Sequence, residues 1–139
     1  MTDQRRPRTF RLSYLLSPLL LLALLACGET PPTATNVDAP LVAKEFVELV
    51  SRKDYANAIG KLATVERMGL PPERLRSVWE NALAQYGEYQ NQSLEGTRPS
   101  DRGETVTMKC AFERGTLQFN LTVNNSGQIA GVSFTDSSN

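Results

Sequence analysis

The side chains best suited to chemistry in this chain are two thiols, because the sequence contains two cysteines and no histidine. Without histidine the chain lacks the commonest general base, the usual activator of a catalytic serine or cysteine, and the commonest zinc ligand. Cys27 ends an apolar segment near the N-terminus, whereas Cys110 lies in an alternating segment near the C-terminus. Their surroundings predict two different roles, and neither thiol lies in a recognisable nucleophile motif.

Cys27 follows a segment with the layout of an export signal. Residues 1–11 carry four arginines, and residues 12–26 form an apolar run dominated by leucine. That run is shorter than the roughly twenty residues that a membrane-spanning helix needs, and Pro18 further weakens a permanent span. A charged region followed by a short apolar region is typical of a signal peptide that is later removed.

The residues at the end of this run, Leu-Leu-Ala-Cys at positions 24–27, resemble the bacterial lipobox. The resemblance implies that the thiol of Cys27 receives a diacylglyceryl group, that the signal is cut before it, and that the new amine is often acylated. The alternative is an ordinary secretory signal that is cut elsewhere, with Cys27 incidental. We expect the lipoprotein, because charge, apolar length, small residue and cysteine occur in the required order.

The stretch after Cys27 predicts a tether. Residues 28–39 are rich in Thr, Pro and Ala and lack apolar periodicity, which is typical of a flexible linker. Gly28, in place of aspartate after the cysteine, resembles the pattern that permits sorting to the outer membrane in organisms with two membranes. We therefore expect a cell-envelope protein with a signal at 1–26, a lipid anchor and tether at 27–39, and one domain at 40–136.

The charge of the expected mature chain argues against a nucleic-acid partner. Four of the fifteen basic residues and one of the fifteen acidic residues precede Cys27, so eleven and fourteen remain, a net charge of −3. A mildly acidic domain without a basic cluster lacks the electrostatic footprint of nucleic-acid binders. Because the sequence also shows no phosphate-binding glycine loop and no paired metal carboxylates, we expect no cofactor.

Helical periodicity fills the first half of the expected domain. Capping residues and apolar spacing predict three helices, over about residues 40–51, 55–62 and 72–86. Asp38 and Asp54 are placed to cap the first two of them.

A period of two replaces the helical spacing in the second half, and it predicts half-buried antiparallel strands over about residues 105–112, 117–123 and 130–134. An earlier strand at 88–95 is less regular, and residues 96–103 are expected to form a loop.

Two-residue turns at Arg114-Gly115 and Asn125-Ser126 would pair every apolar strand residue with another. That register sets Phe119 between Cys110 and Val132 on the core face. It also places Ile129 on the opposite face, where a homodimer could form by packing two sheets together.

Three helices followed by about four antiparallel strands predict an α+β fold, with the helices covering one face of a curved sheet. Signature residues are scattered over the domain: Phe46, Val47, Asp54, Tyr55, 70–73, Trp79, Gly87, 106–113 and 127–131. Together they resemble a bacterial domain family of unknown function numbered 3887, over roughly Pro40 to Phe134. The family is grouped with cystatin-like folds of the nuclear transport factor two and ketosteroid isomerase type, so the resemblance implies that fold and brings no known activity.

Four aromatic residues are candidates for lining a ligand pocket between helices and sheet: Tyr55, Trp79, Tyr86 and Tyr89. Plain core packing is the favoured alternative, because Trp79 sits in the middle of an apolar helix face. Cys110 is expected to be a small buried hydrophobe rather than a reactive thiol, since the alternation turns it toward the core.

Two function classes remain. We favour a non-catalytic binding or interaction domain at the cell envelope, whose partner is an envelope protein or a small apolar ligand. The alternative is a small enzyme or ligand carrier that uses the cavity between helices and sheet. Glu88 or Glu95 could act there as a base of the ketosteroid isomerase kind, but a lone carboxylate in polar surroundings is normally solvated.

Overall fold

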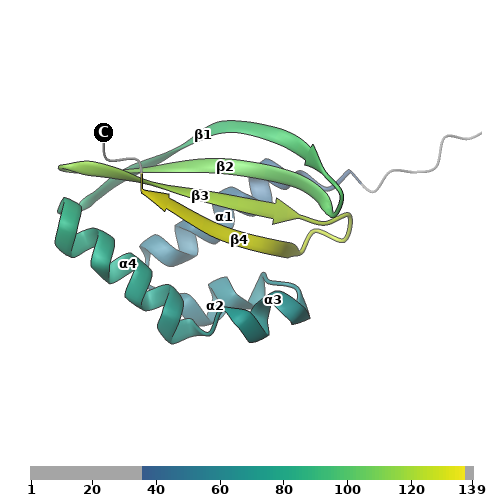
Figure 1. Ribbon diagram of the computed structural model, residues 1–139, viewed down its shortest axis with the longest axis horizontal. Helices are drawn as coiled ribbons and strands as arrows, with labels where there is room; N and C mark the ends of the chain where they lie inside the picture. The colour runs from purple at the N-terminus through teal and green to yellow at the C-terminus, as the bar shows by residue number, and fades with distance from the viewer. Residues whose placement is uncertain (1–35, 137–139) are drawn as a thin grey trace, which may run out of the picture. The chain divides into compact units, whose positions relative to one another are not determined.

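Helices come first and strands second in the computed structural model, which describes residues 36–136 (Figure 1). The helices of this part of the chain are α1 (Ala39–Ser51), α2 (Tyr55–Gly60), α3 (Thr64–Gly69) and α4 (Pro72–Tyr86). The strands are β1 (Tyr89–Ser100), β2 (Gly103–Phe112), β3 (Gly115–Val123) and β4 (Ile129–Asp136). All neighbours pair antiparallel in the order β1-β2-β3-β4, so the α+β class and the meander are confirmed.

The helical half holds one helix more than the three predicted. The additional helix is α3, and it buries none of its residues, so it has no apolar face for periodicity to reveal. α2 is also shorter than predicted: it ends at Gly60, and Leu62 instead forms an isolated parallel bridge with Ile129.

The predicted N-caps are confirmed. The Oδ1 atom of Asp38 accepts a hydrogen bond from the backbone N–H of Leu41 at 3.1 Å, and Asp54 accepts one from Asn57 at 3.4 Å. Each bond satisfies an N–H that the first helical turn leaves without an internal partner.

β1 continues to Ser100 and β2 begins at Gly103, so the loop predicted over residues 96–103 is wrong except for the turn at residues 101 and 102. The register of β1 against β2 shifts twice, between Tyr89 and Asn91 and between Leu94 and Gly96. Such bulges break the period of two, and most of this edge strand is exposed. The alternation that marks a half-buried strand is therefore missing from its sequence.

The hairpin between β2 and β3 turns one residue earlier than predicted. Phe112 pairs with Gly115, so the turn residues are Glu113 and Arg114. Phe119 consequently lies opposite Met108 and not Cys110. Moving a turn by one residue shifts the pairing by two, which keeps every side chain on its predicted face while changing its partner.

The connection between β3 and β4 is longer than the predicted two-residue turn. The Oδ1 atom of Asn124 accepts hydrogen bonds from the backbone N–H groups of Ser126 and Gln128, both at 2.9 Å. A register shift follows: Thr122 pairs with Gly131 but Val123 pairs with Ile129. This shift turns Ile129 into the core, where it is fully buried, so its predicted place on the outer face is wrong.

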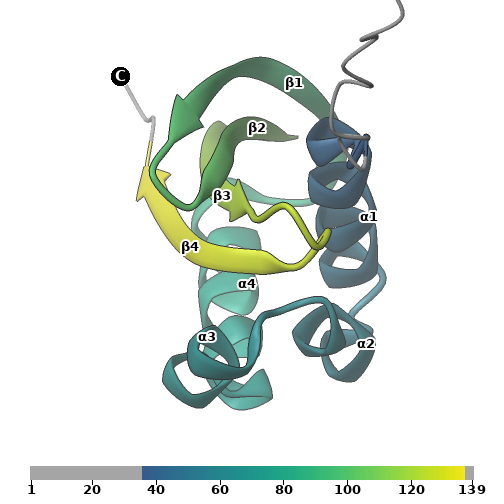
Figure 2. The ribbon, with the colours of Figure 1, turned by 90° about the vertical axis from the view of Figure 1, so that its right-hand side faces the viewer.

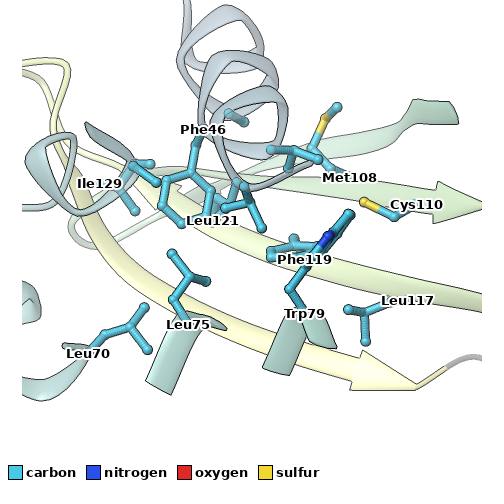
Figure 3. Close-up of a cluster of buried hydrophobic side chains, with 14 of the residues drawn as sticks. Phe46, Leu70, Leu75, Trp79, Met108, Cys110, Leu117, Phe119, Leu121 and Ile129 are labelled. Carbon is cyan, nitrogen blue, oxygen red and sulfur yellow. The ribbon is translucent and has the colours of Figure 1, made fainter. Parts of the chain in front are cut away.

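The core lies between the helices and one face of the sheet. α1 contacts β1, β2 and β3, and α4 contacts β3; Figure 2 shows the strong curvature of the sheet beside these helices. Phe46 of α1, Trp79 of α4 and Phe119 of β3 are all at most 1% exposed and meet at the centre (Figure 3). Burying one such side chain contributes roughly 1.5–3 kcal/mol.

A chain that begins at Asn36 is expected to fold without the segment before it, because the buried residues of the described chain start at Ala39. It should be soluble and unfold in one cooperative transition, followed by circular dichroism during heating. A far-ultraviolet spectrum of a disordered chain would contradict this domain boundary.

Candidate functional site

Three of the four aromatic residues predicted for a pocket meet around Phe112. The ring centroid of Trp79 lies 5.3 Å from those of both Tyr89 and Phe112, and the Tyr86 and Phe112 centroids are 6.1 Å apart. Trp79 is 1% and Tyr86 5% exposed. These are the contacts of packed side chains, as the core-packing alternative expects, and the pocket stays a prediction.

Tyr55 lies apart from this group, on α2. The guanidinium carbon of Arg76 is 5.5 Å from the centroid of its ring, a distance at which a cation and an aromatic face attract each other. The hydroxyl oxygen of Tyr55 is buried and has no hydrogen-bond partner among the described residues. Burial raises the pKa of this hydroxyl, Glu80 raises it further and Arg76 opposes the increase.

Burial also raises the pKa of two further side chains that pack in or against the core. Burial raises the pKa of Cys110 to about 12, and it raises the pKa of Tyr89 to about 12, with smaller contributions from Cys110 and Glu48. Cys110 is fully buried, which confirms that it faces the core. A thiol in this state is a poor nucleophile near neutral pH.

The two carboxylates considered as bases lie at the surface. Glu88 and Glu95 are both exposed, and an oxygen of Glu95 is 4.0 Å from Nζ of Lys109. Within residues 36–136 no three His, Cys, Asp or Glu side chains are grouped so that they could hold a metal ion.

The opposite face of the sheet carries a polar depression that was not predicted from the sequence. We call it the outer-face hollow; its volume is about 280 Å³. It is lined by Glu66, Arg98, Arg102, Thr105, Asn120, Thr122, Gly131, Val132 and Ser133. A second depression of about 300 Å³ adjoins it and shares Arg98 and Asn120.

Cross-strand hydrogen bonds order the floor of the outer-face hollow. The hydroxyl oxygens of Thr105 and Thr122 are 3.0 Å apart, and Thr107 donates to Oδ1 of Asn120 at 2.9 Å. These residues alternate with the core residues of β2 and β3, so the pattern that buries one face places hydroxyl and amide groups on the other.

Charged side chains form the rim of the hollow. Nη1 of Arg102 reaches from the β1–β2 turn to the backbone oxygen of Ala130 at 2.9 Å. On α3, Oε1 of Glu66 accepts a hydrogen bond from the backbone N–H of Val132 at 3.1 Å. The side chain of Arg98, on β1, makes no hydrogen bond or ion pair within the described part of the chain. The site was not predicted from the sequence, because both arginines lie in the segment 96–103 that was expected to be a loop.

The fold and its signature residues can be compared with known families. A family model described as "Protein of unknown function (DUF3887)" matches residues 43–132, well over half of the chain. The chain belongs to this family. The DUF3887 match begins within α1 and ends within β4, so it covers α2 to β3 in full and parts of α1 and β4. The predicted family resemblance is confirmed. Neither curated proteins nor solved structures gave a match.

In the described portion of this DUF3887 protein, no helix has both the length and the apolar character needed to cross a membrane.

Proposed function

We propose that this DUF3887 protein is a cell-envelope lipoprotein, held to a membrane by fatty acids on Cys27, whose domain binds a ligand or partner without catalysing a reaction. The observation that carries the proposal is the order of arginine-rich segment, leucine-rich run, small Ala26 and Cys27 in the sequence. Cys27 and the expected signal at 1–26 lie outside the described residues. With two or three acyl chains the anchor would be stable, whereas a single chain would bind reversibly.

A binding role is supported by the state of the core. A general acid or base works best with a pKa near the operating pH, whereas the pKa values of Tyr55, Tyr89 and Cys110 are all raised away from neutrality. The alternative, a small enzyme or ligand carrier with a cavity between helices and sheet, retains one supporting observation in the unpartnered buried hydroxyl of Tyr55.

The proposal also includes the fold type within the α+β class and the membrane in which the lipoprotein is anchored. A cystatin-like fold is supported by the order of helices and curved antiparallel sheet and by the family resemblance. Gly28 supports sorting to the periplasmic side of the outer membrane where the organism has two membranes. An envelope protein or a small apolar ligand would be the partner. A homodimer through the outer sheet face would have to bury polar groups. Ile129, the apolar residue that was expected on that face, lies in the core instead.

The lipid anchor is tested by growing cells with radioactive palmitate. Wild-type chain should incorporate the label and Cys27→Ser should not, because the serine hydroxyl does not replace the thiol. Cys110→Ala is the matched control: its thiol is buried in the core, so labelling should persist. Equal labelling of wild type and Cys27→Ser would refute the anchor.

A further inference from the structure

We propose that the outer-face hollow binds a sugar acid, a small molecule that combines a carboxylate with several hydroxyl groups. This inference does not depend on the membrane anchor or on the cavity predicted between helices and sheet. It rests on the donors, acceptors and charges that line the hollow.

The floor of the hollow offers hydroxyl donors at fixed positions. Thr105 is only 7% exposed although it lies on the outer face, and its hydroxyl shares one hydrogen bond with Thr122. Two hydroxyl groups that share one bond use one of their two protons, so one proton remains for a ligand. Thr122 is half-buried and lines the hollow, which keeps this pair within reach from outside.

The amide of Asn120 adds further donors beside the threonine pair. Its Oδ1 atom accepts from Thr107, and its Nδ2 atom lies 3.4 Å from the hydroxyl of Thr135. An amide nitrogen carries two hydrogens, so one remains available. Asn120 lines both depressions, and it can therefore serve a ligand that extends from one into the other.

Two guanidinium groups supply positive charge above these donors. Arg102 is held in place by the backbone oxygen of Ala130, and Gly131 leaves room for it, since a Cβ there would lie 3.3 Å from Nη2. Arg98 lines both depressions and has no partner within residues 36–136. Planar guanidinium groups bind carboxylates through paired, charge-assisted hydrogen bonds.

Glu66 favours a hydroxylated carboxylate over an inorganic oxyanion. One of its carboxylate oxygens accepts from Val132, which leaves the other oxygen as an acceptor at the rim. A ligand hydroxyl can donate to that oxygen, whereas phosphate, which has few donors and more negative charge, would be repelled by it. The volumes of about 280 and 300 Å³ are at the lower end of ligand pockets and suit one or two sugar units.

The test is a saturation-transfer NMR titration of the full chain, purified in nonionic detergent, with glucuronate as the probe. Inorganic phosphate carries no carbon-bound proton to observe, so its affinity is measured by its competition with glucuronate. We expect glucuronate to bind in the millimolar range and to bind more tightly than glucose or inorganic phosphate. Arg98→Gln and Arg102→Gln should each weaken glucuronate binding by about ten-fold or more, since each removes a charged hydrogen-bond donor. Thr122→Val should weaken both glucuronate and glucose binding.

Arg74→Gln is the matched control, because Arg74 is an exposed arginine on α4 and does not line the hollow. It should leave the affinity for glucuronate unchanged. The proposal is overturned if glucuronate does not bind, if glucose or phosphate binds as tightly, or if Arg74→Gln reduces binding as much as Arg98→Gln. Palmitate labelling tests the anchor separately, so failure of one proposal does not imply failure of the other.

Discussion

Replacing Phe119 with alanine is expected to lower the free energy of unfolding by about 3–5 kcal/mol. The side chain is fully buried at the centre of the core (Figure 3). Its ring centroid lies 6.3 Å from that of Phe46, 6.2 Å from that of Trp79 and 5.0 Å from that of Phe134. Alanine would leave a cavity between two helices and two strands, which the rigid sheet can close only in part. Urea unfolding measures the loss.

The neighbouring residue provides the control, because Asn120 points to the opposite face of the same strand. It is half-buried and bonds to Thr107 and Thr135, and these bonds can be replaced by water. Asn120→Ala should therefore cost less than about 1 kcal/mol. A larger loss for Asn120→Ala than for Phe119→Ala would mean that the inner and outer faces have been exchanged.

The faces of the strands were predictable from the sequence, whereas their register was not. Alternation determines which residues of a strand share a face, and a shift of the strand pairing by two residues leaves those faces unchanged. The predicted pairing of Phe119 with Cys110 and the observed pairing with Met108 differ by such a shift. Matching apolar residues across the hairpin therefore could not distinguish the two registers. In the observed register Gly115 pairs with Phe112 and packs closely against Tyr86, since a Cβ at Gly115 would lie 2.8 Å from Cε1 of Tyr86.

Ile129 shows where alternation itself fails. The bulge at the start of β4 inserts one residue, and one extra residue moves the next side chain to the other face. The bulge lies beside the Asn124 turn, and Ile129 at the bulge also bridges to Leu62. That bridge joins residues far apart in the sequence, so local spacing carries no sign of it.

The outer-face hollow escaped prediction for a related reason. The alternation in two predicted strands correctly placed its threonines on the face away from the core. Polar residues on that face are typical of any solvated sheet, however, and do not indicate a site. What distinguishes this face is the approach of Arg98 and Arg102 from β1 and its turn. Because β1 is exposed and bulged, only its first half was predicted as a strand, and residues 96–103, which include both arginines, were predicted as a loop.

Gly103, the residue that follows Arg102, should be among the least tolerant positions outside the central core. Its φ angle is +139°, which residues other than glycine rarely adopt. A Cβ at this position would lie 2.8 Å from Cα of Asn124 and even closer to the backbone oxygen of Val123. Gly103→Ala should therefore cost about 3 kcal/mol in the free energy of unfolding, combining backbone strain with a steric clash.

Gly96 is the matched control, since it lies on β1 without a positive φ, and a Cβ there would meet nothing within 4 Å. Gly96→Ala should be neutral or stabilise the protein by up to about 1 kcal/mol, because alanine restricts the unfolded chain more than glycine does. Urea unfolding of both variants compares them directly. If Gly103→Ala is as stable as Gly96→Ala, the close approach of the β1–β2 turn to Val123 is wrong. The placement of Arg102 against Ala130 would then lose its support, because the same turn carries that arginine across the sheet.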